Sequence, residues 1–163
     1  MTFDNSGIRR QDRLLDEPRA VELLTEGEYG FLALGGNADE GLTGGYGIPI
    51  SYVFDGDSIW FHCAPEGEKL KRIAADGGAS FCVVGNTRVL PGKFTTLYES
   101  VMAFGNIEVV SDEPIRYAAL AMLVKKYSPE YVKIGAQYAQ KSFARTTILR
   151  LRIERISAKS KAL

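Results

Sequence analysis

Residues 58–69 read SIWFHCAPEGEK and combine a β-strand with the start of a helix. The run 58–63 is apolar and β-prone, and Pro65 ends it because proline lacks the N–H that a central strand needs. Gly67, followed by charged residues, then predicts a short helix. The segment Asp55-Gly56-Asp57 before this unit is a hairpin signal, which pairs the strand with an earlier one.

Outside this unit the same reasoning predicts several further elements. We expect strands at 29–34, 46–54, 79–84, 95–110 and 146–156, and helices that begin near Asp16, Asp112 and Ser128. Gly105 is a candidate β-bulge, and the five glycines of 35–45 predict a turn-rich connector. Hairpins outnumber crossovers, so the chain is expected to be mostly β, an antiparallel sheet or small barrel with helices outside.

Length and composition favour one globular domain over residues 1–163, with a polar arm at 1–13 and a polar tail at 157–163. Twenty basic residues balance twenty acidic ones, which disfavours nucleic acid or an anionic membrane as partner. The longest apolar run, 117–124, is too short to span a bilayer. With two cysteines and no signal-like N-terminus, we expect a cytoplasmic protein with reduced thiols.

Two polar features could carry chemistry. His62 is the only histidine and lies at a strand end, where its imidazole could bind a ligand or exchange a proton. It could equally be a structural histidine held by hydrogen bonds. Lys69 opens the helix, whose free N–H groups suit a phosphate. Its alternative is a solvated basic face shared with Lys71 and Arg72.

Other candidates are weaker. Cys63 and Cys82 lie in apolar strands, where a thiol is usually inert, and no second His or CxxC pair completes a metal site. Four aromatic side chains could line a pocket or simply fill the core: Tyr46, Tyr52, Trp60 and Tyr98. No Walker or dinucleotide-binding glycine pattern is present.

Six motifs in order carry a resemblance. They are RRQDR (9–13), GFLAL (30–34), GIPISY (47–52), IWFHCAPEGEK (59–69), YESVMAFG (98–105) and LRLRI (149–153). Together they resemble the pyridoxamine 5′-phosphate oxidase-like superfamily of flavin-binding split barrels, most closely the nitroimidazole-resistance (Nim-type) proteins. Glu68 stands where the vitamin B6 oxidases carry an arginine, which argues against pyridoxamine phosphate oxidation.

The resemblance implies a homodimeric split β-barrel with FMN at the subunit interface. The residues that it assigns to the cofactor are Pro49, Ile50, Ser51, His62, Cys63, Ala64, Lys69, Ser100 and Val101. In this assignment Pro49, Ile50 and Ser51 run beside the flavin ring, and Lys69 contacts the phosphate. Ser100 and Val101 meet the flavin from the neighbouring strand.

The expected function is that of an FMN-dependent oxidoreductase, a nitroreductase-like protein that reduces a small molecule. His62 is its catalytic candidate, because an imidazole near the flavin could orient the substrate or give it a proton. Two other classes stay open: a flavin-binding or redox-sensing protein without turnover, and a haem-binding split barrel with His62 as axial ligand.

Overall fold

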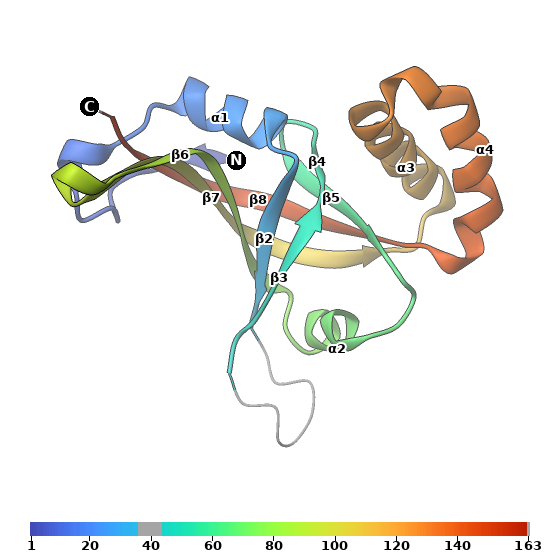
Figure 1. Cartoon of the computed structure of the whole chain (residues 1–163). Helices are drawn as coiled ribbons and strands as arrows, with labels where there is room; N and C mark the ends of the chain where they lie inside the picture. Colours follow the sequence, from blue (N-terminus) through green and yellow to red (C-terminus); the bar gives the residue numbers. More distant parts are fainter. Residues whose placement is uncertain (36–43, 163) are drawn as a thin grey trace.

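The computed structural model describes residues 1–35 and 44–162, in which the strands form one sheet and four α-helices lie outside it (Figure 1). The strands are β1 (Thr2–Phe3), β2 (Tyr29–Leu34), β3 (Tyr46–Ser51), β4 (Val53–Phe54), β5 (Ser58–Cys63), β6 (Gly78–Leu90), β7 (Thr95–Val110) and β8 (Thr147–Lys161). The α-helices are α1 (Glu17–Glu26), α2 (Glu68–Ala75), α3 (Glu113–Tyr127) and α4 (Val132–Ser142), and short 3₁₀ turns are η1 (Gln11–Arg13), η2 (Pro91–Lys93), η3 (Pro129–Tyr131) and η4 (Phe143–Arg145).

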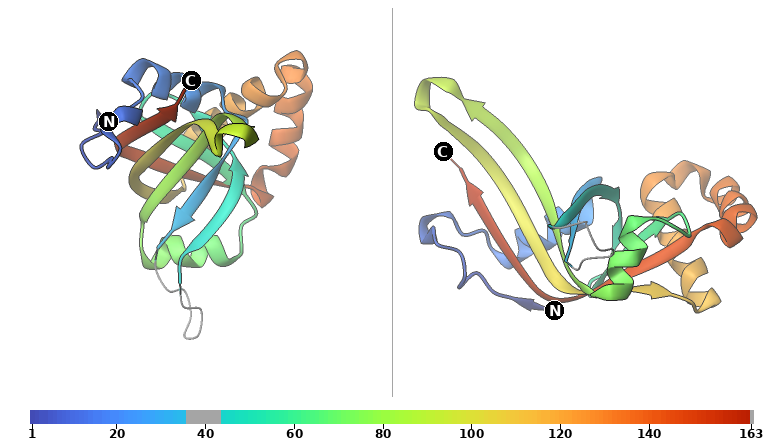
Figure 2. Two further views of the ribbon diagram at one scale, coloured as in Figure 1. Left: turned by 60° about the vertical axis from the view of Figure 1, so that its left-hand side comes forward. Right: turned by 90° about the horizontal axis from the view of Figure 1, so that it is seen from below.

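The sheet has the order β3-β2-β6-β7-β8-β5-β4, and every neighbouring pair on this path is antiparallel. Among the strands that the structure describes, only β1, which lies beside β8, pairs in parallel. The sheet is strongly curved, and the long β6–β7 ribbon extends well beyond the helices (Figure 2). This confirms the expectation of a mostly antiparallel β fold with flanking helices.

The inward face of the sheet holds the main core. Tyr52, Phe61 and Phe81 are fully buried, and their rings meet edge to face with centroids 4.7 and 5.2 Å apart. Burying each of these side chains stabilises the fold by about 2–3 kcal/mol. Helix α1 closes this core with Leu23 and Leu24, and its Leu24 carbonyl accepts a 2.7 Å hydrogen bond from the Tyr52 hydroxyl.

A smaller core lies on the outward face, under α3 and α4. It contains Trp60 from β5, Val110 from β7 and Ile148 from β8, packed against Leu120 and Phe143. Helix α3 begins near Asp112 as expected, and the Asp112 carboxylate caps it by accepting a hydrogen bond from the Ile115 N–H. The two helices therefore cover the part of the outward face formed by the β5 end of the sheet.

Three strands and the bulge agree closely with the sequence analysis. The strands β2, β5 and β7 have the expected bounds, and the register of β7 against β8 shifts between Phe104 and Gly105, which confirms the bulge. A side chain at Gly105 would place its Cβ 1.9 Å from the Arg152 carbonyl oxygen. Glycine is therefore required by close backbone approach.

Other boundaries were wrong. Strand β6 runs to Leu90 instead of ending at Val84, and β8 runs to Lys161 instead of ending at Ile156. The segment 157–161 therefore belongs to the sheet. Buried and exposed side chains continue to alternate in this segment although its composition is polar, since Ala158 is buried while Lys159 is exposed. Most of the predicted connector at 35–45 lies outside the described residues.

The N-terminal segment is also part of the fold. Its β1 pairs with β8, and Asn5 makes two side-chain hydrogen bonds, from Ala158 N–H at 2.8 Å and to the Leu15 carbonyl at 2.9 Å. Among the described residues, no helix is both long enough and apolar enough to cross a membrane.

Candidate functional site

His62 lies on the outward face of β5, where a large cavity opens between the sheet and the helices α3 and α4. The cavity has a volume of about 770 Å³. Alternation along β5 sends His62 and Trp60 outward, while Phe61 is fully buried in the main core. The residues that line it are Ser51, His62, Leu120, Leu123, Val124, Tyr127, Ser128, Tyr131, Ile134, Gly135, Tyr138, Ala139, Ser142 and Thr146.

Ser51 shares this cavity with His62 for a reason of register. Strand β4 pairs Val53 with Trp60, and continuing that register by two residues brings Ser51 opposite His62. Opposite residues of antiparallel strands point to the same face. The two polar side chains therefore face the same cavity, whose lining is otherwise mostly apolar.

The His62 imidazole is available to a ligand. It makes no hydrogen bond or ion pair with any residue of the described ranges 1–35 and 44–162. Burial lowers the pKa of His62 below its ordinary value of 6.5, because desolvation disfavours the imidazolium. At pH 7 the ring is therefore neutral, with one nitrogen that donates and one that accepts.

Tyr127 fixes the wall on which Ser51 lies. Its hydroxyl accepts from the Tyr52 N–H at 2.8 Å and lies 2.6 Å from the Glu28 carbonyl and 2.8 Å from the Tyr52 carbonyl. This contact joins α3 to the break between β3 and β4. The hydroxyl thus sets the position of Ser51 relative to the helices.

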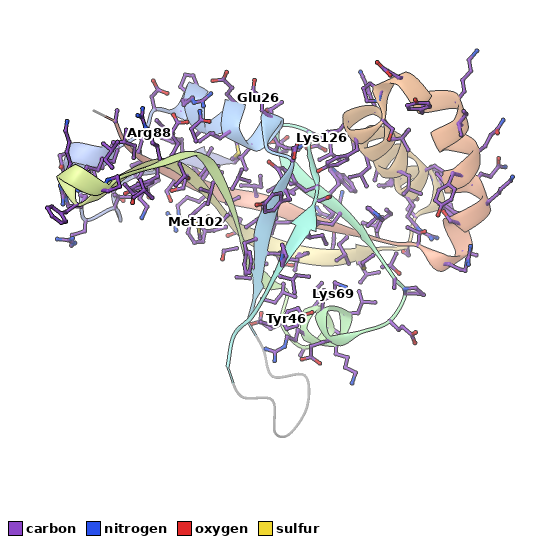
Figure 3. All side chains as sticks on the ribbon, viewed as in Figure 1. Glu26, Tyr46, Lys69, Arg88, Met102 and Lys126 are labelled. Atoms are coloured by element: carbon purple, nitrogen blue, oxygen red, sulfur yellow. The ribbon has the colours of Figure 1, made fainter. Side chains whose placement is uncertain are left out.

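The expected phosphate contact lies on α2, which follows β5 directly. Lys69 is half-buried in the first turn, after Gly67 with its φ of 121° (Figure 3). Its charge acts on Cys63, whose pKa is nevertheless raised because burial outweighs the attraction of Lys69. Ala64 between them is exposed. This segment can offer one cation and free backbone N–H groups to an anion.

Not all predicted residues present a side chain to the outward face. Pro49 and Ser51 do. Pro49 pairs with Phe31, Phe31 pairs with Cys82, and Cys82 pairs with Met102, and paired residues of antiparallel strands point to the same face. Ile50 packs against the main core, as does Cys63, and Val101 is fully buried there. These three residues can meet a ligand on the outward face only through their backbone.

Ser100 and His62 do not line one cavity within the chain. Ser100 opens to a separate cavity at the other end of β7, which shares no lining residue with the cavity at His62. The structure thus brings Ser51 and His62 together, places Lys69 on the helix that follows, and leaves Ser100 apart.

Comparison with known proteins agrees with this architecture. A family model described as pyridoxamine 5′-phosphate oxidase matches residues 16–160. The chain belongs to this family. A search of curated proteins found no match.

Solved structures share the fold of this family member. A candidate 5-nitroimidazole antibiotic resistance protein from Bacteroides thetaiotaomicron aligns with a TM-score of 0.70 and 16% identity, over 91% of this chain and 86% of that one. The FAD and heme binding protein from Mycobacterium smegmatis gives 0.69 and 21%, over 94% and 75%. The flavocytochrome Anf3 from Azotobacter vinelandii gives 0.70 and 18%, over 91% and 68%. At these identities the likeness shows the fold alone.

In this member of the pyridoxamine 5′-phosphate oxidase family, the aromatic wall differs from the expected one. None of the aromatic side chains singled out from the sequence lines the cavity at His62. Tyr52 is in the main core and Tyr46 packs against it, Trp60 lies beneath the helices, and Tyr98 lines the other cavity. The wall is instead made by Tyr127, Tyr131 and Tyr138. Tyr127 ends α3, Tyr131 lies in η3 and Tyr138 lies in α4, so no single helical spacing in the sequence signals this wall.

Proposed function

We propose that the protein is a flavin-dependent oxidoreductase that binds FMN and reduces a small molecule in the cavity at His62. The observation that carries this proposal is that Ser51 and His62 line one tyrosine-lined cavity, and that the chain runs from β5 into the cationic start of α2. The family and the names of its structural relatives, which include flavin-binding and nitroimidazole-resistance proteins, support the same class of function.

The residues present fit FMN. A cavity of about 770 Å³ falls in the size range of small-molecule sites, roughly 300–1,000 Å³. Its apolar and tyrosine lining suits a planar aromatic ring, and backbone groups around Pro49 and Ser51 can hydrogen-bond the polar edge of that ring. Lys69 and the N–H groups at the start of α2 would hold the phosphate.

Bound FMN would supply the electron or hydride transfer, while the protein supplies position and shielding. The tyrosines of α3 and α4 would exclude water from a substrate that lies against the ring. The neutral imidazole of His62 would donate a hydrogen bond to the substrate from whichever ring nitrogen carries the proton, Nδ1 or Nε2.

We further propose that the working unit is a homodimer. The outward sheet face carries exposed apolar side chains, including Tyr29 at 64%, Phe31 at 50% and Val84 at 61% exposure. Exposed apolar groups on paired strands are typical of an interface. A second copy on this face could also bring its Ser100 to the flavin, which the single chain does not do.

A haem protein is the second candidate. It is favoured by the unengaged imidazole of His62 in a large apolar cavity, and by the name of the Mycobacterium smegmatis relative. Haem titration separates the two functions. A Soret band that disappears in His62→Ala, together with no affinity for FMN, would replace the flavin proposal with this one.

Substitution of Lys69 tests the flavin proposal. Lys69→Ala should weaken FMN binding about 5- to 150-fold, equivalent to roughly 1–3 kcal/mol for a charge-assisted phosphate contact. The matched control is Lys133→Ala, which removes an exposed lysine of α4 and should leave FMN affinity unchanged. Equal affinities in wild type and Lys69→Ala would refute the assignment.

Substitution of His62 tests the catalytic role. His62→Ala should lower the rate at which reduced flavin passes electrons to a nitroaromatic acceptor, with little change in melting temperature. If melting temperature falls strongly while turnover stays constant, His62 is a structural histidine.

A further inference from the structure

The cavity at His62 is lined by side chains that carry no formal charge. Among the described residues that line it, none is acidic and none is a lysine or an arginine. Burial lowers the pKa of His62 and keeps its imidazole neutral at pH 7. Burial also raises the pKa of Tyr127, so its hydroxyl stays un-ionised. A ligand in this cavity therefore meets dipoles and apolar groups, but no countercharge.

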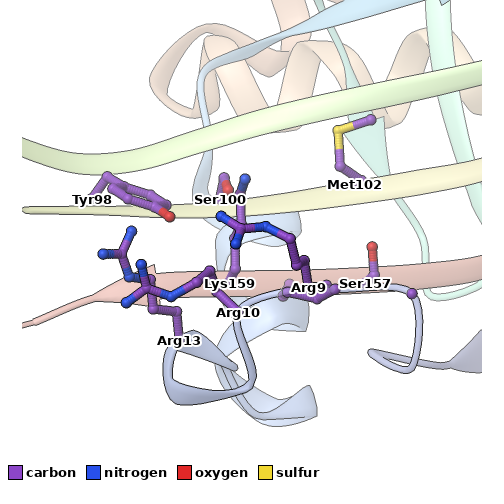
Figure 4. Close-up of a pocket in the computed structure, with 11 residues that line it drawn as sticks. Arg9, Arg10, Arg13, Tyr98, Ser100, Met102, Ser157 and Lys159 are labelled. Atoms are coloured by element: carbon purple, nitrogen blue, oxygen red, sulfur yellow. The ribbon is translucent and has the colours of Figure 1, made fainter.

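This lack of charge is local to the cavity at His62. The cavity at the far end of β7 has the opposite character. Its cationic side chains are Arg9, Arg10, Arg13 and Lys159 (Figure 4). Ser100 lines that cavity as well, so its cations belong with the cofactor cleft of the proposed dimer. Anionic groups thus find partners elsewhere on the chain.

Two cations lie near the uncharged cavity but are engaged with other groups. Arg116 donates to the carbonyls of Phe143 and Thr146, at 3.0 and 2.8 Å. The Lys126 Nζ is buried 3.9 Å from the centroid of the Tyr52 ring. Neither Arg116 nor Lys126 lines the cavity. A charged ligand would therefore leave water without gaining an ion pair, which costs free energy.

Apolar side chains form both the floor and the rim of the cavity. Leu120 and Leu123 are buried and form the floor. Ile134 and Tyr138 line the same cavity but are 65% and 73% exposed, so they form its rim. An apolar ring that enters the cavity covers these rim side chains, and the removal of their surface from water favours binding.

We infer that the substrate of this cavity is an uncharged, largely apolar ring compound, and that the cavity rejects charged analogues of the same ring. The ligand is a substrate only if the proposed function holds, since it would occupy the same cavity. The discrimination by charge follows from the lining alone. The neutral imidazole of His62 can donate one hydrogen bond to an acceptor on the ring and so orient it.

Calorimetric titration with three probes of one ring tests the inference at pH 7. The probes are 4-nitrobenzyl alcohol, which is neutral, 4-nitrobenzoate, which is an anion, and 4-nitrobenzylammonium, which is a cation. They are titrated into the protein loaded with FMN and, in a second series, into the protein without it. We expect the alcohol to bind at least about tenfold more tightly than either ion in both series.

A charge placed on the rim gives a sharper test. Ile134→Lys adds a cation to the lining and should raise the affinity for 4-nitrobenzoate about fivefold, while the affinity for the alcohol stays within about twofold. The matched control is Val132→Lys on the same helix, because Val132 is also exposed, at 44%, but does not line the cavity. This control should bind all three probes like wild type.

Three results would overturn the inference: no binding of the alcohol, binding of either ion as tight as that of the alcohol, or the same probe affinities in Ile134→Lys and Val132→Lys. Failure of the proposed function is seen separately, as an absence of FMN binding in the first series. The order of the three probes in the second series then still decides whether the cavity selects by charge.

Discussion

Replacing Tyr127 by phenylalanine removes the hydroxyl that joins α3 to the break between β3 and β4. That hydroxyl accepts from the Tyr52 N–H and donates to the carbonyl of Glu28 or Tyr52, so two hydrogen bonds are lost at a time. At about 1 kcal/mol each, with a further cost for the N–H of a buried residue, Tyr127→Phe should destabilise the fold by about 2–3 kcal/mol. For a chain of this size that lowers the melting temperature by roughly 5–10 °C.

Thermal denaturation followed by circular dichroism measures this change. Tyr131→Phe is the matched control, because Tyr131 lines the same cavity but is 60% exposed and makes no side-chain hydrogen bond within the described chain. It should shift stability by less than about 0.5 kcal/mol. The reasoning is refuted if Tyr127→Phe melts with wild type, or if both variants lose the same amount.

Three other perturbations have defined outcomes. Burial lowers the pKa of Lys126 to about 8, below the unfolded value, so its ammonium is destabilising below pH 8 and the penalty fades toward about pH 10.5. Relative to Lys126→Met, the free energy of unfolding of the wild type in urea should therefore rise by about 1 kcal/mol from pH 7 to pH 10, after allowing for solvent screening. A difference between the two proteins that stays constant with pH contradicts this. Gly105→Ala should cost about 3 kcal/mol or more, because the new Cβ meets the Arg152 carbonyl, whereas Gly92→Ala in open space should be near neutral. Phe31→Glu should convert a dimer to monomers in light scattering, and an unchanged mass would exclude this face as the interface.

The sequence alone was sufficient for features that depend on local pattern. Alternation and turn signals predicted β2, β5 and β7, and α3 begins near Asp112 as expected. Adjacent positions of a strand point to opposite faces, which is why His62 lines the cavity while Cys63 packs against the core.

Features that depend on distant parts of the chain were missed. The tyrosine wall exists because α3 and α4 dock on the outward face of β5, and no local pattern specifies that contact. The polar arm is held to β8 through Asn5 and Ala158, residues separated by nearly the whole chain. The lysines and serines at the end of β8 also made this segment read as a polar tail, although its side chains still alternate and Ala158 remains buried.

Sedimentation velocity of the freshly purified protein, recorded both in the ultraviolet and at the visible absorption band of flavin, tests the central proposal most directly. We predict one boundary that carries the flavin colour at the mass of two chains, twice 17.9 kDa, after FMN is added in stoichiometric amount. Colour that stays with free FMN, over a colourless boundary at the mass of one chain, would contradict it.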